Sequence, residues 1–284
     1  MKIPAALLLL VTFAAGCRSS SLANVPSVRY ENTEQAMEIA AARADAVKTI
    51  SAPGLMTLRR PDGESVRFDV ALARDDAGRL RLRAWKLGRA VFDLTMNDDG
   101  VYLLTPDDPS LKQKVRSAGV SARQLAETWN LFTRGDLFRA EDRQDRRVSR
   151  FERWLVCEVR QPAASGRASA GGDGGPVGGR AGGSDGGVNG AGGARGGGGG
   201  GTVRCALDTV TLVPLWYVMS DEQGRARFRL DLADYRMIGD LPFAHRYTAT
   251  SDAGEILITL RDVELNGELP PDAFKPPRRA EKLP

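Results

Sequence analysis

Residues 80–106 read LRLRAWKLGRAVFDLTMNDDGVYLLTP, and their pattern decides the fold class. Apolar and polar side chains alternate along residues 80–83 and again along 92–96, which predicts strands with one apolar face. A short turn around Gly88 and the tetrapeptide NDDG at residues 97–100 supply the residues that tight turns need. Because strands joined by tight turns run antiparallel, this stretch predicts a β-meander.

The same alternation continues on both sides of this stretch. Upstream, apolar residues at 66, 68, 70 and 72 face away from Arg67 and Asp69, and the turn DDAG follows; downstream, residues 225–235 and 245–266 alternate again. In the last segment the apolar phase changes between Leu260 and Val263. This shift predicts a β-bulge near Arg261 and Asp262, and bulges are typical of strongly curved sheets.

Two segments have helical rather than strand periodicity. Residues 32–50 predict a helix capped by Asn32 or Thr33 and ended before Pro53-Gly54. A short helical stretch at 110–119 is followed by residues 121–132, where Leu125, Trp129 and Phe132 recur at helical spacing. The predicted fold class is therefore α+β, mainly β, with a highly curved antiparallel sheet and a few helices.

The N-terminus predicts export. Residues 5–15 form an apolar run of 11 residues behind Lys2, too short for the roughly 20 that span a bilayer, so residues 1–16 are interpreted as a signal peptide. Ala15-Gly16-Cys17 resembles the bacterial lipobox, with Ala14 where the usual leucine would stand. We expect Cys17 to carry the lipid attachment; ordinary secretion with a free cysteine is the alternative.

Several consequences follow for location and partners. Acyl chains on Cys17 would hold the protein on a membrane without a spanning helix, with residues 17–29 as a lipidated tether. Arg18 follows where the enteric sorting rule places Asp for inner-membrane retention, so we expect the outer membrane, facing the periplasm; inner-membrane anchoring stays open. The mature chain keeps 39 basic and 36 acidic residues, since only Lys2 is removed, and a net charge of about +3 does not favour a nucleic-acid partner.

Residues 162–202 differ in composition from the rest of the chain. They hold 20 of its 32 glycines and essentially no large apolar residue, so we expect a disordered insert. The flanking stretches, RFERWLVCEVRQ and TVRCALDTVTLVPLWYVMSD, are both typical of strands. We expect one hairpin with a swollen turn, and one domain made of residues 30–161 and 203–284.

The two remaining cysteines lie on either side of this insert. Cys157 and Cys205 could meet across the hairpin, and the periplasm permits disulfides. With Cys17 acylated an even pair remains, so we expect a Cys157–Cys205 disulfide; two buried free thiols are the alternative.

Candidates for catalysis are few. His245 is the sole histidine of the chain, and we expect it at a surface or an edge. Carboxylate pairs such as Asp75-Asp76, Asp98-Asp99 and Asp107-Asp108 stand beside Gly or Pro, where Asp favours turns. The sequence therefore predicts no enzyme, no catalytic residues, no metal and no cofactor.

The strands supply one continuous apolar face. We expect it to surround a cavity for acyl chains, closed by a helical lid; a packed core that fills the same space is the alternative. The residues of this expected cavity are Phe68, Leu80, Leu82, Phe92, Leu94, Leu125, Trp129, Phe132, Phe228, Leu230, Ile256 and Ile258.

Three features together resemble the LolA/LolB superfamily: residues 80–106, the order of helix, meander, helical interruption and second meander, and the ending ILITLRDVELNGELPPDAFKPP. The resemblance covers roughly residues 30–160 and 203–278; the Gly-rich insert is foreign to it. It implies an incomplete, highly curved antiparallel barrel with helices on its concave face. An anchored Cys17 makes the chain more similar to the LolB type, which uses an exposed apolar loop for insertion.

The resemblance implies a lipid-anchored envelope protein that binds the acyl chains of lipids or lipoproteins. Its role would be to localise lipoproteins or lipids at the outer membrane. Its partners would be acyl chains, the membrane through its lipidated N-terminus, and an envelope protein. The alternative is a structural or assembly lipoprotein that docks a protein partner and has no lipid ligand.

Overall fold

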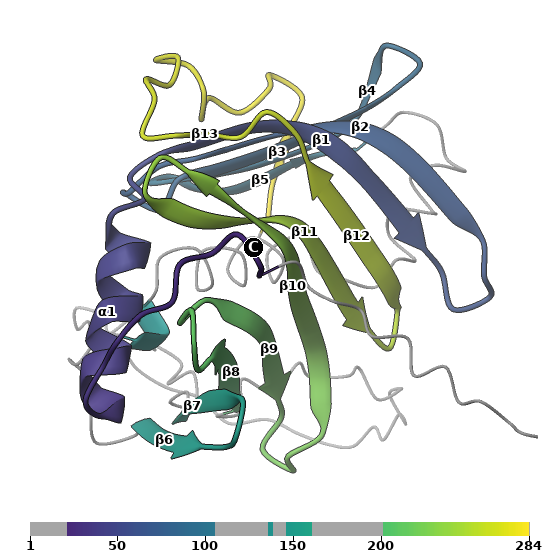
Figure 1. Cartoon of the computed structure of the whole chain (residues 1–284). Helices are drawn as coiled ribbons and strands as arrows, with labels where there is room; N and C mark the ends of the chain where they lie inside the picture. Colours follow the sequence, from purple (N-terminus) through teal and green to yellow (C-terminus); the bar gives the residue numbers. More distant parts are fainter. Residues whose placement is uncertain (1–21, 106–135, 139–145, 161–200, 284) are drawn as a thin grey trace, which may run out of the picture.

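The computed structural model describes residues 22–105, 136–138, 146–160 and 201–283, and its main feature is one antiparallel sheet of 14 strands (Figure 1). The strand order is β14-β5-β4-β3-β2-β1-β12-β11-β10-β9-β8-β7-β6, and β13 also pairs with β1. The sheet curves strongly without closing, which confirms the predicted incomplete barrel. The strands are β1 (Ile50–Arg59), β2 (Ser65–Arg74), β3 (Leu80–Lys86), β4 (Arg89–Asn97), β5 (Gly100–Leu104), β6 (Arg146–Arg150), β7 (Trp154–Arg160), β8 (Thr202–Asp208), β9 (Pro214–Ser220), β10 (Ala226–Ile238), β11 (Leu241–Ser251), β12 (Gly254–Leu260), β13 (Glu264–Leu265) and β14 (Glu281–Lys282).

Helix α1 (Thr33–Asp45) packs on the inner side of the sheet. The side chain of Asn32 caps it by accepting a hydrogen bond from the backbone N–H of Gln35 at 2.9 Å. Ala36, Met37 and Ala40 are its buried residues. A short 3-10 helix, η1 (Asp136–Phe138), lies next to α1 and β7.

Helix α1 ends earlier than the sequence predicted, and Pro53-Gly54 lies inside strand β1 rather than in a break. The carbonyl of Pro53 accepts a hydrogen bond from the N–H of Arg261 at 2.7 Å. In an antiparallel ladder the N–H and C=O of one residue point to the same side, so the missing N–H of Pro53 points to the gap between β12 and β13. A proline is tolerated there because the gap interrupts the ladder.

The predicted irregularity near Arg261 and Asp262 lies at this same gap. Strand β12 ends at Leu260, Asp262 adopts a positive φ of 39°, and β13 resumes pairing with β1 at Glu264. The shift of the apolar residues from one set of alternate positions to the other therefore marks an interruption between β12 and β13, which both pair with β1.

The strands on either side of the insert pair with each other. Cys157 lies directly opposite Cys205 in the β7–β8 ladder, and Arg160 lies opposite Thr202 next to the insert, most of which is outside the described residues. The apolar stretch after the insert forms two strands, β8 and β9, rather than one. The carboxylate of Asp208 turns the chain between them by accepting hydrogen bonds from the N–H groups of Val210 and Thr211.

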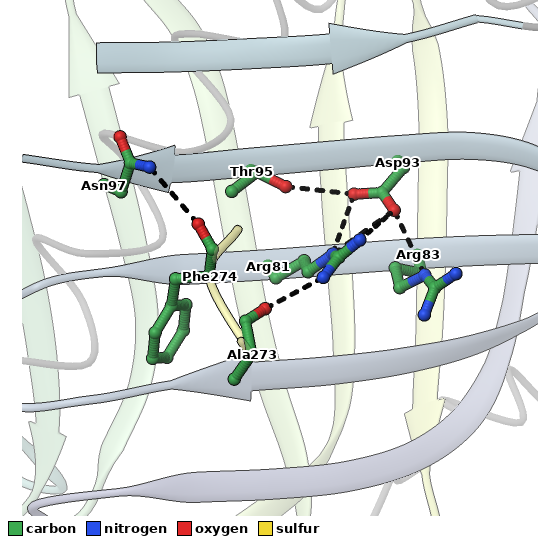
Figure 2. Close-up of polar contacts among 7 residues, drawn as sticks. All are labelled: Arg81, Arg83, Asp93, Thr95, Asn97, Ala273 and Phe274. Atoms are coloured by element: carbon green, nitrogen blue, oxygen red, sulfur yellow. Dashed lines mark hydrogen bonds and ion pairs between the residues drawn. The ribbon is translucent and has the colours of Figure 1, made fainter. Parts of the chain in front are cut away.

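The outer face of the sheet carries a buried polar cluster (Figure 2). Asp93 of β4, 1% exposed, accepts hydrogen bonds from Arg81 of β3 at 2.9 and 3.1 Å and lies 3.1 Å from Nε of Arg83. Thr95 donates to the same carboxylate at 3.0 Å. Asp93 is thus a buried counter-ion for Arg81 and Arg83, which lie on the face of the sheet opposite its apolar face.

This cluster holds the C-terminal segment against the outer face. Arg81 donates to the carbonyl of Ala273 at 3.1 Å, and Asn97 donates to the carbonyl of Phe274 at 3.2 Å (Figure 2). The ring of Phe274 is buried, with the guanidinium of Arg79 5.0 Å from its centre. The segment then reaches β14, which pairs with the edge strand β5.

The part of the expected tether that the structure describes lies against the domain. Val25 is buried, and the N–H of Val28 donates to the carbonyl of Val210 at 2.8 Å. The attachment fixes the chain before α1 to the loop between β8 and β9.

Candidate functional site

The predicted cavity residues that the structure describes all lie on the inner face of the sheet. Residues directly opposite in antiparallel strands point to the same side, and Met56 lies opposite both Phe68 and Ile258. Leu82 likewise lies opposite Leu94. Eight of the nine are buried and Phe228 is partly buried; the nine are Phe68, Leu80, Leu82, Phe92, Leu94, Phe228, Leu230, Ile256 and Ile258.

Four further predicted site residues fall outside the described part of the chain. They are Leu125, Trp129 and Phe132 of the expected helical lid, and Cys17 of the expected lipid attachment. Their roles stay predictions.

An apolar pocket of about 100 Å³ opens between α1, the β8–β9 loop and the joined ends of β10 and β11. Its walls are mainly aliphatic and aromatic, and the lining residues include Ala40, Ala44, Val47, Phe138, Leu212, Val213, Pro214, Leu232, Tyr235, Phe243 and Tyr247. Tyr247 connects the pocket with the inner face, because it lies opposite Ile258 in the β11–β12 ladder.

Polar groups stand at a few points of this lining. The guanidinium of Arg43 donates to the carbonyl of Thr211 at 2.5 Å, and the hydroxyl of Tyr235 donates to the carbonyl of Pro214. Burial lowers the pKa of Arg43 from a high ordinary value and raises the pKa of both Tyr235 and Tyr247. At neutral pH the pocket is therefore lined by neutral hydroxyls and one arginine cation among its described residues.

None of the nine described cavity residues predicted from sequence lines this pocket. Its walls come from a helix, a loop and two strand ends that are far apart in the chain, so strand alternation could not find them. A weak signal existed in α1, where Ala40 and Ala44 stand four residues apart on one helical face. Small residues there leave room between the helix and the sheet.

The predicted Cys157–Cys205 disulfide is not formed. Both residues are free thiols, buried, and directly opposite each other on β7 and β8. Each thiol has another partner: Cys157 donates to the carbonyl of Leu137 at 3.4 Å, and Cys205 is hydrogen-bonded to Tyr217. Burial raises the pKa of Cys157 to about 11 and that of Cys205 well above its ordinary value, which disfavours the thiolate that disulfide chemistry requires.

His245 is buried in β11 rather than at a surface or an edge. Its ring Nδ1 lies 3.2 Å from the carbonyl of Phe243, and the Phe243 ring meets it edge-on. Burial lowers the pKa of His245, so the imidazole is neutral at pH 7. Among the described residues no group of three or more His, Cys, Asp or Glu side chains could hold a metal ion.

Large exposed apolar side chains occur at two places that the sequence did not single out. Leu87 is 94% exposed at the β3–β4 turn, with a positive φ of 51°. Phe151, Trp154 and Val210 are exposed at the β6–β7 turn and the β8–β9 loop. In Figure 1 the β3–β4 and β6–β7 hairpins lie at opposite sides of the molecule.

Comparisons at the level of sequence find no relative of this chain. No protein-family model and no curated protein matches the sequence. In the described part of the chain, no helix is both long enough and apolar enough to cross a bilayer.

Among the solved structures that match most of the chain, two align at TM-score 0.50. One, described as an outer membrane lipoprotein-sorting protein domain from Vibrio parahaemolyticus, aligns at TM-score 0.50 and 14% identity over 85% of this chain and 95% of that one. The other, a LolA superfamily protein from Nitrosomonas europaea, aligns at TM-score 0.50 and 12% identity over 84% of this chain and 97% of that one. At such identities the likeness is one of architecture, and this chain has the fold of the LolA superfamily, as the resemblance of residues 80–106 implied.

Proposed function

We propose that this is a lipid-anchored envelope protein that binds the acyl chains of lipids or lipoproteins between α1 and the inner face of its sheet. Cys17 carries the anchor, the domain faces the periplasm from the outer membrane, and the role is lipoprotein or lipid localisation. No reaction is catalysed. The matched lipoprotein-sorting domain supports this proposal through its fold.

The observation that carries the proposal is the apolar pocket beside α1. Ala40, Arg43 and Ala44 of α1 line it together with aromatic side chains of other elements. Burial of apolar surface would bind an acyl chain at about 25 cal/mol per Å², and the arginine would favour a ligand with an anionic head.

The size of the pocket defines what it can hold as it stands. About 100 Å³ is below the roughly 300–1,000 Å³ of ordinary ligand sites, so it accepts the end of an acyl chain. A whole chain requires α1 to move away from the sheet. Helix α1 can move more readily than a strand, because packing and two side-chain contacts, Arg43 with Thr211 and Glu34 with Arg146, hold it in place of a ladder of backbone hydrogen bonds.

The test uses two tryptophan substitutions on α1. Ala44 lines the pocket, whereas Ala42 is exposed on the same helix. In a chain that begins at Arg18, and so keeps every described residue, Ala44→Trp should weaken binding of a fluorescent long-chain fatty acid by about 10-fold or more, because an indole occupies the pocket. Ala42→Trp should bind as the parent does; equal binding by all three chains would contradict the pocket as the site.

The second candidate function is the scaffold lipoprotein that docks a protein partner. It is favoured by the buried state of the inner-face residues, which a packed core also produces. Native mass spectrometry of the detergent-free protein separates the two: phospholipid or lipopeptide released by organic solvent supports the carrier. A chain that carries no lipid and does not bind added fatty acid supports the scaffold function. Mass spectrometry of the membrane-extracted N-terminal peptide tests acylation of Cys17 separately.

A further inference from the structure

Exposed apolar side chains gather at one end of the molecule. Phe151 is 55% exposed, Trp154 45% and Val210 57%; these three are named the hairpin-end patch. Among the described residues they are three of the four exposed large apolar side chains, the fourth being Leu87. Isolated exposed apolar residues are common, but a group that includes two aromatic rings marks an interaction surface.

Backbone hydrogen bonds hold the patch in place. The N–H of Phe151 donates to the carbonyl of Trp154 at 2.8 Å, which closes the β6–β7 turn. The N–H of Thr209 donates to the carbonyl of Arg153 at 3.2 Å and joins the β8–β9 loop to that turn. The patch is thus preformed, and little ordering is needed when it binds.

The surroundings of the patch are basic. Arg147, Arg150 and Arg153 are exposed along β6 and the following turn, where Glu152 is an exposed carboxylate; two partly buried carboxylates, Glu158 and Asp208, lie opposite Arg147 and Trp154. No described residue forms an ion pair with any of the three, although the Arg150 guanidinium lies over the ring of Tyr30, 5.9 Å from its centre. Their exposed guanidinium groups suit an anionic surface.

We propose that the hairpin-end patch docks on the surface of a bilayer that contains anionic phospholipid. Trp and Phe side chains favour the membrane–water interface, and arginines beside them are attracted to anionic headgroups. Three apolar residues are fewer than the core of a protein–protein interface contains, since such interfaces bury about 800 Å² on each side. A shallow lipid surface suits the patch better than a protein partner.

The path of the N-terminal segment agrees with this orientation. Val28 is bonded to Val210 of the patch and lies 11 positions after Cys17. Eleven extended residues span at most about 37 Å, so an anchored Cys17 keeps the patch near the bilayer. This step rests on the anchor proposed above; the patch itself does not.

The experiment measures binding of the chain that begins at Arg18 to sedimented vesicles of phosphatidylcholine, with and without 25% phosphatidylglycerol. We expect binding to the anionic vesicles with a blue shift of tryptophan emission, and about 10-fold or more weaker partitioning for Phe151→Ser/Trp154→Ser. Arg150→Glu/Arg153→Glu should abolish the preference for phosphatidylglycerol. Leu87→Ser, which changes a still more exposed apolar residue at the opposite side, should bind as the parent does.

Three results would overturn the proposal: no vesicle binding by the parent chain, unchanged binding by the patch variant, or a loss confined to Leu87→Ser. Unchanged melting temperatures show that the variants remain folded. The outcome is separable from that of the acyl-chain proposal, because the patch variant should keep its fatty-acid binding while Ala44→Trp should keep its vesicle binding.

Discussion

Asp93 shows how one residue on the outer face organises its neighbours. A carboxylate that is 1% exposed meets the guanidinium of Arg81, whose side chain is 14% exposed, and that of Arg83, which is 43% exposed. A buried charge is costly unless it is paired and hydrogen-bonded, and both conditions are met here. Because Arg81 also bonds to Ala273, the carboxylate supports the C-terminal segment as well as the sheet.

Replacing the carboxylate of Asp93 should lower the stability of the fold. Asp93→Ala leaves Arg81 without its buried counter-ion, and we expect the free energy of unfolding to fall by about 3 kcal/mol, measured by urea denaturation. Asp69→Ala, an exposed carboxylate on the outer face of β2, is the matched control and should change it by less than about 0.5 kcal/mol. A loss below about 1 kcal/mol for Asp93→Ala would show that the two arginines are solvated well enough without it.

At the scale of the elements, strand β1 joins the two halves of the sheet. It pairs with β2 on one side and with β12 and β13 on the other, although Pro53 and Gly54 argue against a strand there. The proline lies at the gap between β12 and β13. A Cβ placed on Gly54 would stand 2.5 Å from the carbonyl oxygen of Thr259, so the close approach of β12 requires glycine.

Gly54→Ala should therefore disturb the β1–β12 ladder. We expect a loss of about 3 kcal/mol in unfolding free energy or failure to fold, because the atom it meets is backbone and cannot rotate away. Gly63→Ala serves for comparison: Gly63 has a φ of 89° with nothing within 4 Å of an added Cβ, and about 1 kcal/mol of backbone strain is expected. Equal losses in the two variants, measured by urea denaturation, would mean that steric contact with β12 is not the reason for Gly54.

At the scale of the whole molecule, the long insert enters between two strands that pair along seven residues each. Arg160 and Thr202, the last paired residues, bring its ends together. The β7–β8 hairpin thus meets the insert at one end and carries the β6–β7 turn, with Phe151 and Trp154, at the other. The pocket and the hairpin-end patch both lie outside the insert.

Replacing residues 162–200 by a four-residue turn should preserve the fold. If the insert is disordered, as its composition predicts, closing a loop of that length has an entropic cost, so we expect an unfolding free energy that is unchanged or raised by up to about 2 kcal/mol, measured by urea denaturation. A Gly/Ser segment of the natural length is the control and should match the parent chain. A loss of more than about 1 kcal/mol in the shortened chain would show that the insert packs on the domain.

Much of the fold could be predicted because strand alternation and turn chemistry are local. The strands around residues 66–74, 80–97 and 226–260, the cap at Asn32 and the irregularity after Leu260 all follow from neighbouring residues. Strand β1 could not, since its proline is acceptable only beside a gap that another strand creates. The spacing of Cys157 and Cys205 correctly suggested that they meet across the hairpin, but it could not show that the free thiols have hydrogen-bond partners in Leu137 and Tyr217.

By itself, then, the sequence determined a curved antiparallel sheet with one apolar face, because side-chain periodicity depends only on order along the chain. Tertiary structure alone decided where space remains and what is exposed. The pocket beside Ala44, the burial of His245 and the grouping of Phe151 with Val210 each join residues from separate elements. Such contacts depend on how the strands curve and how closely α1 approaches them, and no local pattern encodes either quantity.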